Sequence, residues 1–381
     1  MSVNPFYYGR IVESAAFCNR SDELVELERV CRNSNSIFLY AERRLGKTSL
    51  IFKLLERLPK NEFVAVYIDL WPTYGEDSFT LTMAKEIAEA AGPNLEKLME
   101  ISKSLFSRLS PTVGTDDQGK PTVTFGMAAK KIDIPALEEV LEAPAKLANQ
   151  LGKKCVVVFD EFQQILQYDQ DIVERRLRSI IQHHKNVAYI FMGSRKHLIH
   201  DLFENNSRPL YRAAAHFPLG PIAVEHWTPF IWSRFHNAEK FISKELIGAI
   251  CEKTEGHPFY TQHLCHVIWE ITPTKEKVTA EIVTEATDLL LDRESYAFTT
   301  LFDTLTANQK RLLEAIAKEG EQAQPYEAEF VFRSGFKSAS AVQSALKALI
   351  GLDIVDRTEG GNYMVTDRFL RLWIRRRINA D

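Results

Sequence analysis

The sequence predicts an α/β domain with a parallel sheet and helices on both faces, followed by an all-helical region and a C-terminal winged helix-turn-helix. Apolar, strand-like runs alternate with helical segments over about the first 220 residues, a pattern typical of parallel sheets. The pattern then turns helical, and the last segment combines three helical stretches with a hairpin signal at Glu359–Gly361. We expect domains at residues 1–222, 223–300 and 301–381.

Five apolar runs are expected to form the sheet, at residues 36–41, 63–71, 155–162, 187–194 and 216–222. The third run, CVVVFDEF, is rich in valine, which is typical of a strand covered on both faces. One stretch, at about 110–135, combines turn-forming residues with a β-like alternation. We interpret it as an insertion into the first domain, either a hairpin or a mobile segment. A surface decoration is favoured over a substrate or partner loop.

The stretch IFLYAERRLGKTSL, residues 37–50, places a phosphate-binding pattern between the first strand and a helix. The P-loop pattern G-x-x-x-x-G-K-[ST] is matched at Gly46, Lys47 and Thr48, but its first glycine is replaced by Ala41. Backbone N–H groups of such a loop bind phosphates, the lysine adds positive charge, and the threonine hydroxyl binds Mg²⁺. The predicted nucleotide-binding residues here are Ala41, Arg43, Arg44, Leu45, Gly46, Lys47, Thr48 and Ser49.

The backbone conformation of Ala41 decides whether this substitution matters. A positive φ at an alanine would cost on the order of 1 kcal/mol. An extended backbone at the end of the strand would cost little, because Lys47 and Thr48 supply the chemical groups. We therefore predict an ordinary site if the φ of Ala41 is extended, and slow, switch-like nucleotide handling if it is strained.

Two carboxylates end the third strand, where ligands bind in open α/β folds. The Asp160 carboxylate is suited to binding Mg²⁺ together with the Thr48 hydroxyl. The Glu161 carboxylate is suited to orienting or deprotonating a water molecule. The alternative is an acidic pair that only caps the strand. We predict that Lys47 and Glu161 are catalytic.

The fourth strand ends beside the third and is followed by Ser194 and Arg195. The serine is predicted to contact phosphate or water, and Arg195 to neutralise charge in the transition state as a third catalytic residue. The alternative is a solvated basic turn. Arg208 and Arg212 are weaker candidates for phosphate contacts.

The overall composition excludes some functions. A net charge of −4 and a pI of about 6.2 do not suit a protein that binds nucleic acid over its whole surface. Five cysteines fit no disulfide framework, and the cysteines and histidines near residue 265 are interpreted as packed helix residues rather than a zinc site. No signal peptide or membrane span is expected, so a cytoplasmic location is predicted.

Together these motifs resemble the archaeal-type ATPases of the STAND branch of the AAA+-related P-loop NTPases. The resemblance covers nearly the whole chain and is carried by the N-terminal segment 4–27, with NPFYYGRIV and FCNRSDELVEL, and by AERRLGKTSL (41–50), VVVFDEFQ (156–163), GSRKHLI (193–199), RPLYRAA (208–214), EGHPFY (255–260) and VTDRFLRLWI (365–374). It implies ATP or ADP and Mg²⁺ as cofactors. It also implies that Gly256 and Pro258, in a helical lid, face the nucleotide, and it places Tyr7, Tyr8 and Arg20 near the base.

The resemblance implies a nucleotide-controlled switch, in which ATP closes the lid and hydrolysis or exchange reopens it. A non-hydrolysing or very slow regulatory module, with DNA or protein binding as its output, is the alternative. We therefore expect the chain to bind a nucleotide. Further expected partners are DNA, another protein or a second copy of the chain.

The winged helix supplies two sets of residues for contacts with DNA. Its third helix is expected to present Ser338, Ser340, Gln343, Ser344 and Lys347, with one positive charge among them. The tail adds Arg368, Arg371, Arg375, Arg376 and Arg377. The alternative is that the winged helix packs on the ATPase or on a protein and that these arginines are a solvated helix end.

Overall fold

The computed structural model describes residues 3–9, 17–92, 94–127, 136–194, 196–358 and 360–380. The chain divides into two compact units, one formed by Asn19–Gly220 and the other by Pro221–Asp381 together with Met1–Cys18. The N-terminal segment thus groups with the helical unit and not with the sheet, a placement that no sequence pattern indicated. Each unit is described separately below.

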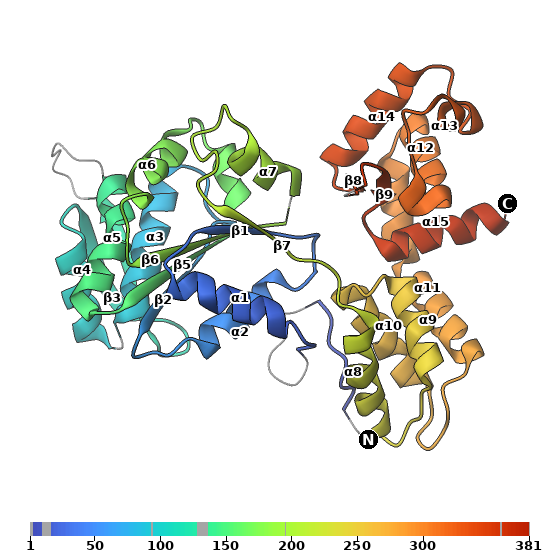
Figure 1. Cartoon of the computed structure of the whole chain (residues 1–381), viewed down its shortest axis with the longest axis horizontal. Coiled ribbons are helices and arrows are strands. Elements are labelled where there is room, and N and C mark those ends of the chain that lie inside the picture. The colour runs from blue at the N-terminus through green and yellow to red at the C-terminus, as the bar shows by residue number, and fades with distance from the viewer. Residues whose placement is uncertain are drawn as a thin grey trace. The chain divides into compact units, whose positions relative to one another are not determined.

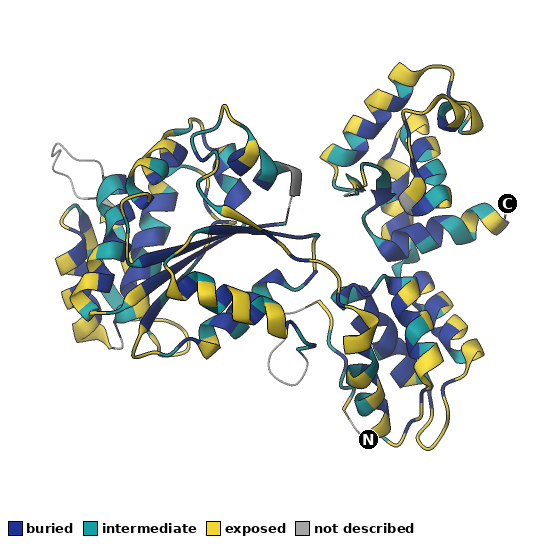
Figure 2. Ribbon diagram, viewed as in Figure 1, coloured by how far each residue is buried: buried dark blue, intermediate teal, exposed yellow. Residues whose placement is uncertain are grey.

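A five-stranded parallel sheet is the centre of the first unit, as predicted (Figure 1). Its strand order is β2-β5-β6-β1-β7. The strands are β1 (Ile37–Tyr40), β2 (Phe63–Asp69), β5 (Lys154–Asp160), β6 (Val187–Gly193) and β7 (Ala215–Pro218). Apart from Lys154, every residue of β5 and β6 is buried, which explains their near-continuous apolar sequences. Figure 2 shows the buried sheet and the exposed outer surfaces of the helices.

Helices cover both faces of this sheet. The α-helices of the first unit are α1 (Ser21–Arg32), α2 (Lys47–Arg57), α3 (Glu76–Ala91), α4 (Leu95–Leu105), α5 (Ala136–Leu151), α6 (Ile172–Ile181) and α7 (Lys196–Glu204). Helices α1 and α2 lie on one side, and α3, α5 and α6 on the other (Figure 1). A 3₁₀ helix, η2 (Phe162–Gln167), begins after Glu161, the residue that follows β5. The predicted three-layer arrangement is confirmed.

The insertion contains an antiparallel hairpin of β3 (Leu109–Thr115) and β4 (Pro121–Met127). Its register runs from Leu109 opposite Met127 to Thr115 opposite Pro121. Glu89 of α3 fixes the hairpin, because its carboxylate accepts hydrogen bonds from the Thr122 hydroxyl and from the backbone N–H of Val123. Of the two interpretations of this stretch, a hairpin or a mobile segment, the structure shows a hairpin at 109–127. The rest of the insertion, at 128–135, lies outside the described residues.

The second unit is largely helical. Its first group comprises α8 (Val224–His236), α9 (Lys244–Thr254), α10 (Pro258–Ile271) and α11 (Ala280–Thr304). The winged helix comprises α12 (Ala307–Glu319), η3 (Gly320–Gln322), α13 (Ala328–Arg333), α14 (Ala339–Gly351), β8 (Val355–Arg357), β9 (Tyr363–Val365) and α15 (Arg368–Ala380). The apolar residues of both groups form one continuous core. No helix in the described part of the chain is long and apolar enough to cross a membrane.

Local sequence explains where the winged-helix elements begin. Thr306 and Gln309 form a capping box at the start of α12, in which each side chain bonds to the backbone of the other residue. The Ser338 hydroxyl accepts a hydrogen bond from the backbone N–H of Ala341 and so caps α14. The two strands β8 and β9 pair antiparallel around the predicted turn, which confirms the wing.

Candidate nucleotide-binding site

The loop between β1 and α2 has the geometry of a phosphate-binding loop. Ala41 does not have a positive φ, whereas Arg44 and Gly46 do, at 60° and 93°. Gly46 is the residue before the first turn of α2, where the absence of a Cβ lets a phosphate approach the backbone. The missing glycine at position 41 therefore costs the loop little, which supports the first of the two outcomes predicted for Ala41.

We expect Ala41→Gly to change ATP affinity less than about threefold, because residue 41 needs no left-handed backbone. The variant should be slightly less stable, by about 0.5–1 kcal/mol, since glycine loses more chain entropy on folding. Titration with ATP and chemical denaturation measure the two effects. Gly46→Ala is the matched control and should weaken binding clearly, because its φ is positive. A tenfold gain in affinity for Ala41→Gly would contradict this account.

Lys47 is the buried cation of the loop. It is 7% exposed, and its ammonium donates hydrogen bonds to the carbonyl oxygens of Ala41 and Glu42, at 3.2 and 3.1 Å. Burial lowers the pKa of Lys47 to about 8, against the opposing effects of the Glu161 and Asp160 carboxylates. Phosphate oxygens at the loop would provide the anionic partner that this buried charge requires.

This pKa predicts a pH dependence of nucleotide binding. Bound phosphate stabilises the charged lysine, so the pKa of Lys47 should rise from about 8 on binding. Above that pH, binding must take up a proton, and affinity should fall by at most about tenfold per pH unit. Calorimetry at about pH 9, in buffers of different ionisation enthalpy, measures the uptake. Binding heats that do not depend on the buffer would exclude Lys47 as the titrating group.

Asp160 ends β5 and forms the candidate metal site with Thr48. The Thr48 hydroxyl donates to Asp160 Oδ2 at 3.3 Å, and the backbone N–H of Glu161 donates to Oδ1 at 2.9 Å. The Tyr67 hydroxyl, from the neighbouring strand β2, also donates to Oδ2. Burial, and then the negative charge of Asp160, raises the pKa of Tyr67, so its hydroxyl stays a donor. A carboxylate and a hydroxyl are oxygen ligands of the kind that Mg²⁺ prefers.

Glu161 lies beside Asp160 in a left-handed conformation with φ 49°. Its Oε2 accepts hydrogen bonds from the Ser194 hydroxyl at 2.9 Å and from the amide of Gln163. Ser194 follows β6, so the predicted meeting of the third and fourth strands brings the two side chains together. Among the described residues Oε1 has no partner, which leaves it able to accept a proton from water.

Gln163 depends on a glycine in the neighbouring strand. A Cβ at Gly193 would lie 2.4 Å from Gln163 Oε1. Gly193 therefore makes room for the amide that holds Glu161. Nothing in the sequence indicated either Gln163 or Tyr67. The contact of Tyr67 with Asp160 follows from the strand order, in which β2 pairs with β5. Gln163 lies two residues after Glu161, in η2, and the fold of that turn brings its amide to the carboxylate.

Arg20 supports the loop from behind. It is buried, and its guanidinium donates to the carbonyl oxygens of Leu45 at 3.5 Å and Gly220 at 2.7 Å, while it also pairs with Glu23. The contact with the Leu45 carbonyl holds the P-loop backbone directly before Gly46. Arg20 was predicted near the base of the nucleotide, and its described contacts are with the P-loop backbone.

The other loop candidates differ in exposure. Arg43 and Arg44 are exposed, whereas Leu45 and Ser49 are buried. Arg208 forms ion pairs with Glu174 and Asp201, at 3.1 and 2.9 Å, which favours a structural role. The Arg212 guanidinium lies 5.2 Å from the ring of Tyr211. Arg195 lies outside the described residues, so its catalytic role stays a prediction.

Gly256 and Pro258 form the turn between α9 and α10 in the second unit. The Gly256 carbonyl accepts hydrogen bonds from the backbone N–H of Ile222 and the indole of Trp227, at 3.1 and 3.0 Å. Pro258 occupies the first turn of α10, where its missing N–H is not needed. Tyr8, predicted near the base, stacks on His263 of α10 at 3.7 Å between ring centres. The backbone N–H of Tyr7 likewise donates a hydrogen bond to the side chain of Gln262 in α10.

The predicted outward face of α14 is exposed along its length, at Ser338, Ser340, Gln343, Ser344 and Lys347. The tail arginines, by contrast, have partners within the chain. Arg375 donates to the carbonyl oxygen of Ala317 at 2.6 Å, and Arg376 pairs with Asp292 at 2.6 Å. The Arg377 guanidinium lies over the ring of Phe302, 5.1 Å from its centre. Arg375 and Arg376 are thus partly buried against the second unit, whereas Arg377 is exposed.

Comparisons with known proteins identify the family and the fold. A family described as an ATPase domain predominantly from Archaea matches residues 17–264, and one described as a probable winged helix domain matches residues 296–376. The chain is similar to the Walker-type ATPase of Pyrococcus abyssi, with 17% identity, a TM-score of 0.63, and coverage of 94% of this chain and 96% of that one. No curated protein matches the chain.

Two structures of the Aeropyrum pernix ORC2 protein are also similar. The ADPNP–ADP complexes have 13% identity, a TM-score of 0.55, and coverage of 98% of this chain and 99% of that one. The ADP form has 12% identity, a TM-score of 0.53, and coverage of 99% and 97%. At sequence identities this low, the similarity to these solved structures establishes the fold alone.

Proposed function

Because the chain belongs to the family of ATPase domains predominantly from Archaea, we propose that it is a Mg²⁺-dependent ATPase that works as a nucleotide-controlled switch. One observation carries this proposal. Lys47, Thr48, Asp160 and Glu161 come from two separate segments and meet at one edge of the sheet, with Thr48 bonded to Asp160. A buried cation, a carboxylate with a hydroxyl, and a second carboxylate are the groups that phosphoryl transfer needs.

Each side chain of the site would have its own role in ATP hydrolysis. The Lys47 ammonium exchanges the carbonyl oxygens of Ala41 and Glu42 for phosphate oxygens. Thr48 and Asp160 would hold magnesium, which supplies positive charge to the β- and γ-phosphates when it is bound. Glu161, held through Oε2 by Gln163 and Ser194, accepts the proton of the attacking water at Oε1.

A second candidate is a very slow or non-hydrolysing nucleotide-binding module. This candidate is favoured by the hydrogen bonds that both carboxylates already accept from other groups of the protein. Asp160 accepts from Thr48, Tyr67 and a backbone N–H, and Glu161 accepts from two side chains. If these bonds persist with nucleotide present, the carboxylates are less available for metal and water. ATP or ADP would then act as a switching ligand.

Turnover separates the two candidates. Phosphate release by the purified full-length protein is measured with saturating ATP, with and without Mg²⁺. The ATPase proposal expects multiple turnovers that require Mg²⁺. The binding-module proposal expects tight nucleotide retention with no turnover. Absence of both turnover and retention would overturn both.

The winged helix is the proposed output of the switch, through a protein or through DNA. DNA binding through phosphate contacts needs several Lys or Arg and is salt-sensitive. The exposed face of α14 offers Lys347, and Lys337 is exposed just before that helix, while Arg375 and Arg376 contact other residues of the second unit. These contacts favour a protein surface as the partner. A salt titration of duplex DNA binding by the full chain distinguishes the two, because a steep salt dependence would support DNA.

A further inference from the structure

Tyr67 contacts the candidate metal site from β2, a strand that carries none of the predicted site residues. Strands β2 and β5 pair in parallel, with Tyr67 opposite Val158 and Asp69 opposite Asp160. Residues opposite each other share one face of a sheet, and so do residues two apart on one strand. Tyr67 and Asp160 are therefore diagonal neighbours on one face, and the Tyr67 hydroxyl donates a hydrogen bond to Asp160 Oδ2.

The ring of Tyr67 packs on the helix that carries Thr48. Its centre lies 4.8 Å from the ring centre of Phe52. Phe52 follows Thr48 by four residues in α2, so the two side chains lie on one face of that helix, one turn apart. Tyr67 thus contacts α2 through its ring and β5 through its hydroxyl. These are the two elements that supply the candidate metal ligands, whose oxygen atoms lie 3.3 Å apart.

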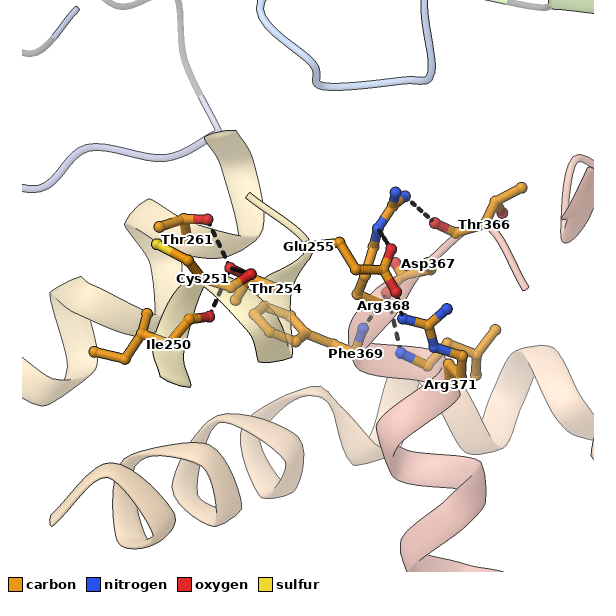
Figure 3. A network of polar contacts seen from close by, with 11 residues as sticks. Ile250, Cys251, Thr254, Glu255, Thr261, Thr366, Asp367, Arg368, Phe369 and Arg371 are labelled. Carbon is orange, nitrogen blue, oxygen red and sulfur yellow. Dashed lines mark hydrogen bonds and ion pairs between the residues drawn. The ribbon is translucent and has the colours of Figure 1, made fainter. Parts of the chain in front are cut away.

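A carboxylate in the second unit shows the effect of charged partners. Glu255 Oε2 accepts a hydrogen bond from Arg368 Nε at 2.8 Å, and Oε1 accepts from Arg371 Nη2 (Figure 3). Both arginines are buried. Each oxygen of Glu255 thus faces a cation, so the negative charge of this carboxylate is compensated within the chain. Such a carboxylate stabilises the packing and offers little charge to a metal ion.

The donors around Asp160, by contrast, are neutral groups. The buried Asp160 carboxylate accepts from the hydroxyls of Tyr67 and Thr48 and from the backbone N–H of Glu161. Neutral donors stabilise an ionised carboxylate and orient it without cancelling its charge. A carboxylate offers about four acceptor positions, so these three contacts leave room for a cation. Asp160 is therefore held in one orientation by contacts that leave its charge for Mg²⁺.

We propose that Tyr67 is a positioning residue of the metal site: its hydroxyl holds the Asp160 carboxylate toward Thr48 and thereby sets the affinity for Mg²⁺. This inference rests on the proposed function, in which Thr48 and Asp160 hold magnesium beside the nucleotide. Hydrogen bonds to a metal ligand orient it, and their loss typically lowers metal affinity by about 10- to 100-fold. Phosphate contacts come from the P-loop instead of β2, so the binding of metal-free nucleotide should not depend on this hydroxyl.

The test is Tyr67→Phe in the full chain, which keeps the ring and removes the hydroxyl. Binding of a non-hydrolysable ATP analogue is titrated in EDTA and at increasing Mg²⁺ concentrations, so that no turnover is needed. We expect the half-saturating Mg²⁺ concentration to rise by about 10- to 100-fold, while the dissociation constant in EDTA stays within about twofold. Tyr74→Phe is the matched control and should change neither value, since Tyr74 is 82% exposed shortly after the same strand.

A double-mutant cycle shows whether Tyr67 acts through Asp160. Asp160→Asn alone should weaken Mg²⁺ binding. Tyr67→Phe should then add little to it, because the hydroxyl has no charged carboxylate left to position. Full additivity of the two effects would contradict the inference.

The outcomes separate the inference from the function on which it rests. If the wild type binds the analogue equally well with and without Mg²⁺, the proposed metal site fails and the inference fails with it. If the wild type requires Mg²⁺ and Tyr67→Phe matches it or binds Mg²⁺ more tightly, the positioning role alone is overturned. Equal losses of binding in EDTA and in Mg²⁺ would indicate a general structural role and would also overturn it.

Should Tyr67→Phe fail to fold, Phe52→Leu takes its place. This variant keeps the Tyr67 hydroxyl and removes the ring on which Tyr67 packs. It should raise the half-saturating Mg²⁺ concentration severalfold without changing binding in EDTA. An unchanged Mg²⁺ requirement would overturn the positioning role.

Discussion

Lys47→Ala is expected to weaken ATP binding by about 100-fold, because a charge-assisted hydrogen bond to phosphate contributes up to about 3 kcal/mol. The empty variant should be as stable as the wild type or more so. In the empty protein the ammonium is buried against carbonyl oxygens, and its burial lowers the pKa to about 8. The variant thus loses the buried positive charge of Lys47. Burial of this charge destabilises the empty protein, whereas the same charge binds the phosphates of the nucleotide.

Thermal unfolding with and without Mg²⁺–ATP measures both effects. The wild type should be stabilised by ATP, and Lys47→Ala should not. Lys53→Ala is the control on the same helix, since Lys53 is partly exposed and pairs with Glu56. Equal stabilisation of Lys47→Ala and the wild type would show that nucleotide binds elsewhere.

Glu161→Gln is expected to lower the rate of ATP hydrolysis by 100- to 10,000-fold, on the order of the contribution of a general base. Binding of ATP should be nearly unchanged, because glutamine has the same size and the P-loop contacts remain. The amide cannot accept the proton of the attacking water. Single-turnover hydrolysis and a separate binding titration distinguish the chemical step from affinity.

Asp169→Asn provides the matched control for this variant. Asp169 is an exposed carboxylate a few residues further along the chain, so its loss should leave the rate unchanged. A Glu161→Gln protein with a rate within a fewfold of the wild type would remove Glu161 from the mechanism.

The sequence predicted the parts of the site that lie on continuous segments. The P-loop is a strand, a turn and a helix in one stretch, so Gly46, Lys47 and Thr48 follow from local pattern alone. Asp160 and Glu161 end a valine-rich strand, and alternation of strands with helices places that strand end at the same edge. The conformation of Ala41 was left open, because residue identity does not fix φ at the end of a strand.

Contacts across strands and between distant segments could not be predicted. Tyr67 reaches Asp160 from β2, and Gln163 fits only because Gly193 in β6 lacks a side chain. The arginines of the tail were assigned to solvent or DNA, whereas Arg368 and Arg371 are buried against Glu255 more than a hundred residues earlier. Such pairs depend on the packing of whole elements, which periodicity does not specify.

Stoichiometric nucleotide binding tests the central claim most directly. Wild-type protein is incubated with Mg²⁺–ATP, desalted and denatured, and the released adenine nucleotide is identified and quantified per chain beside Lys47→Ala. This account predicts about one ATP or ADP per wild-type chain and far less for the variant. No retained nucleotide in the wild type, together with no binding in a titration, would contradict it, and so would equal amounts from the two proteins.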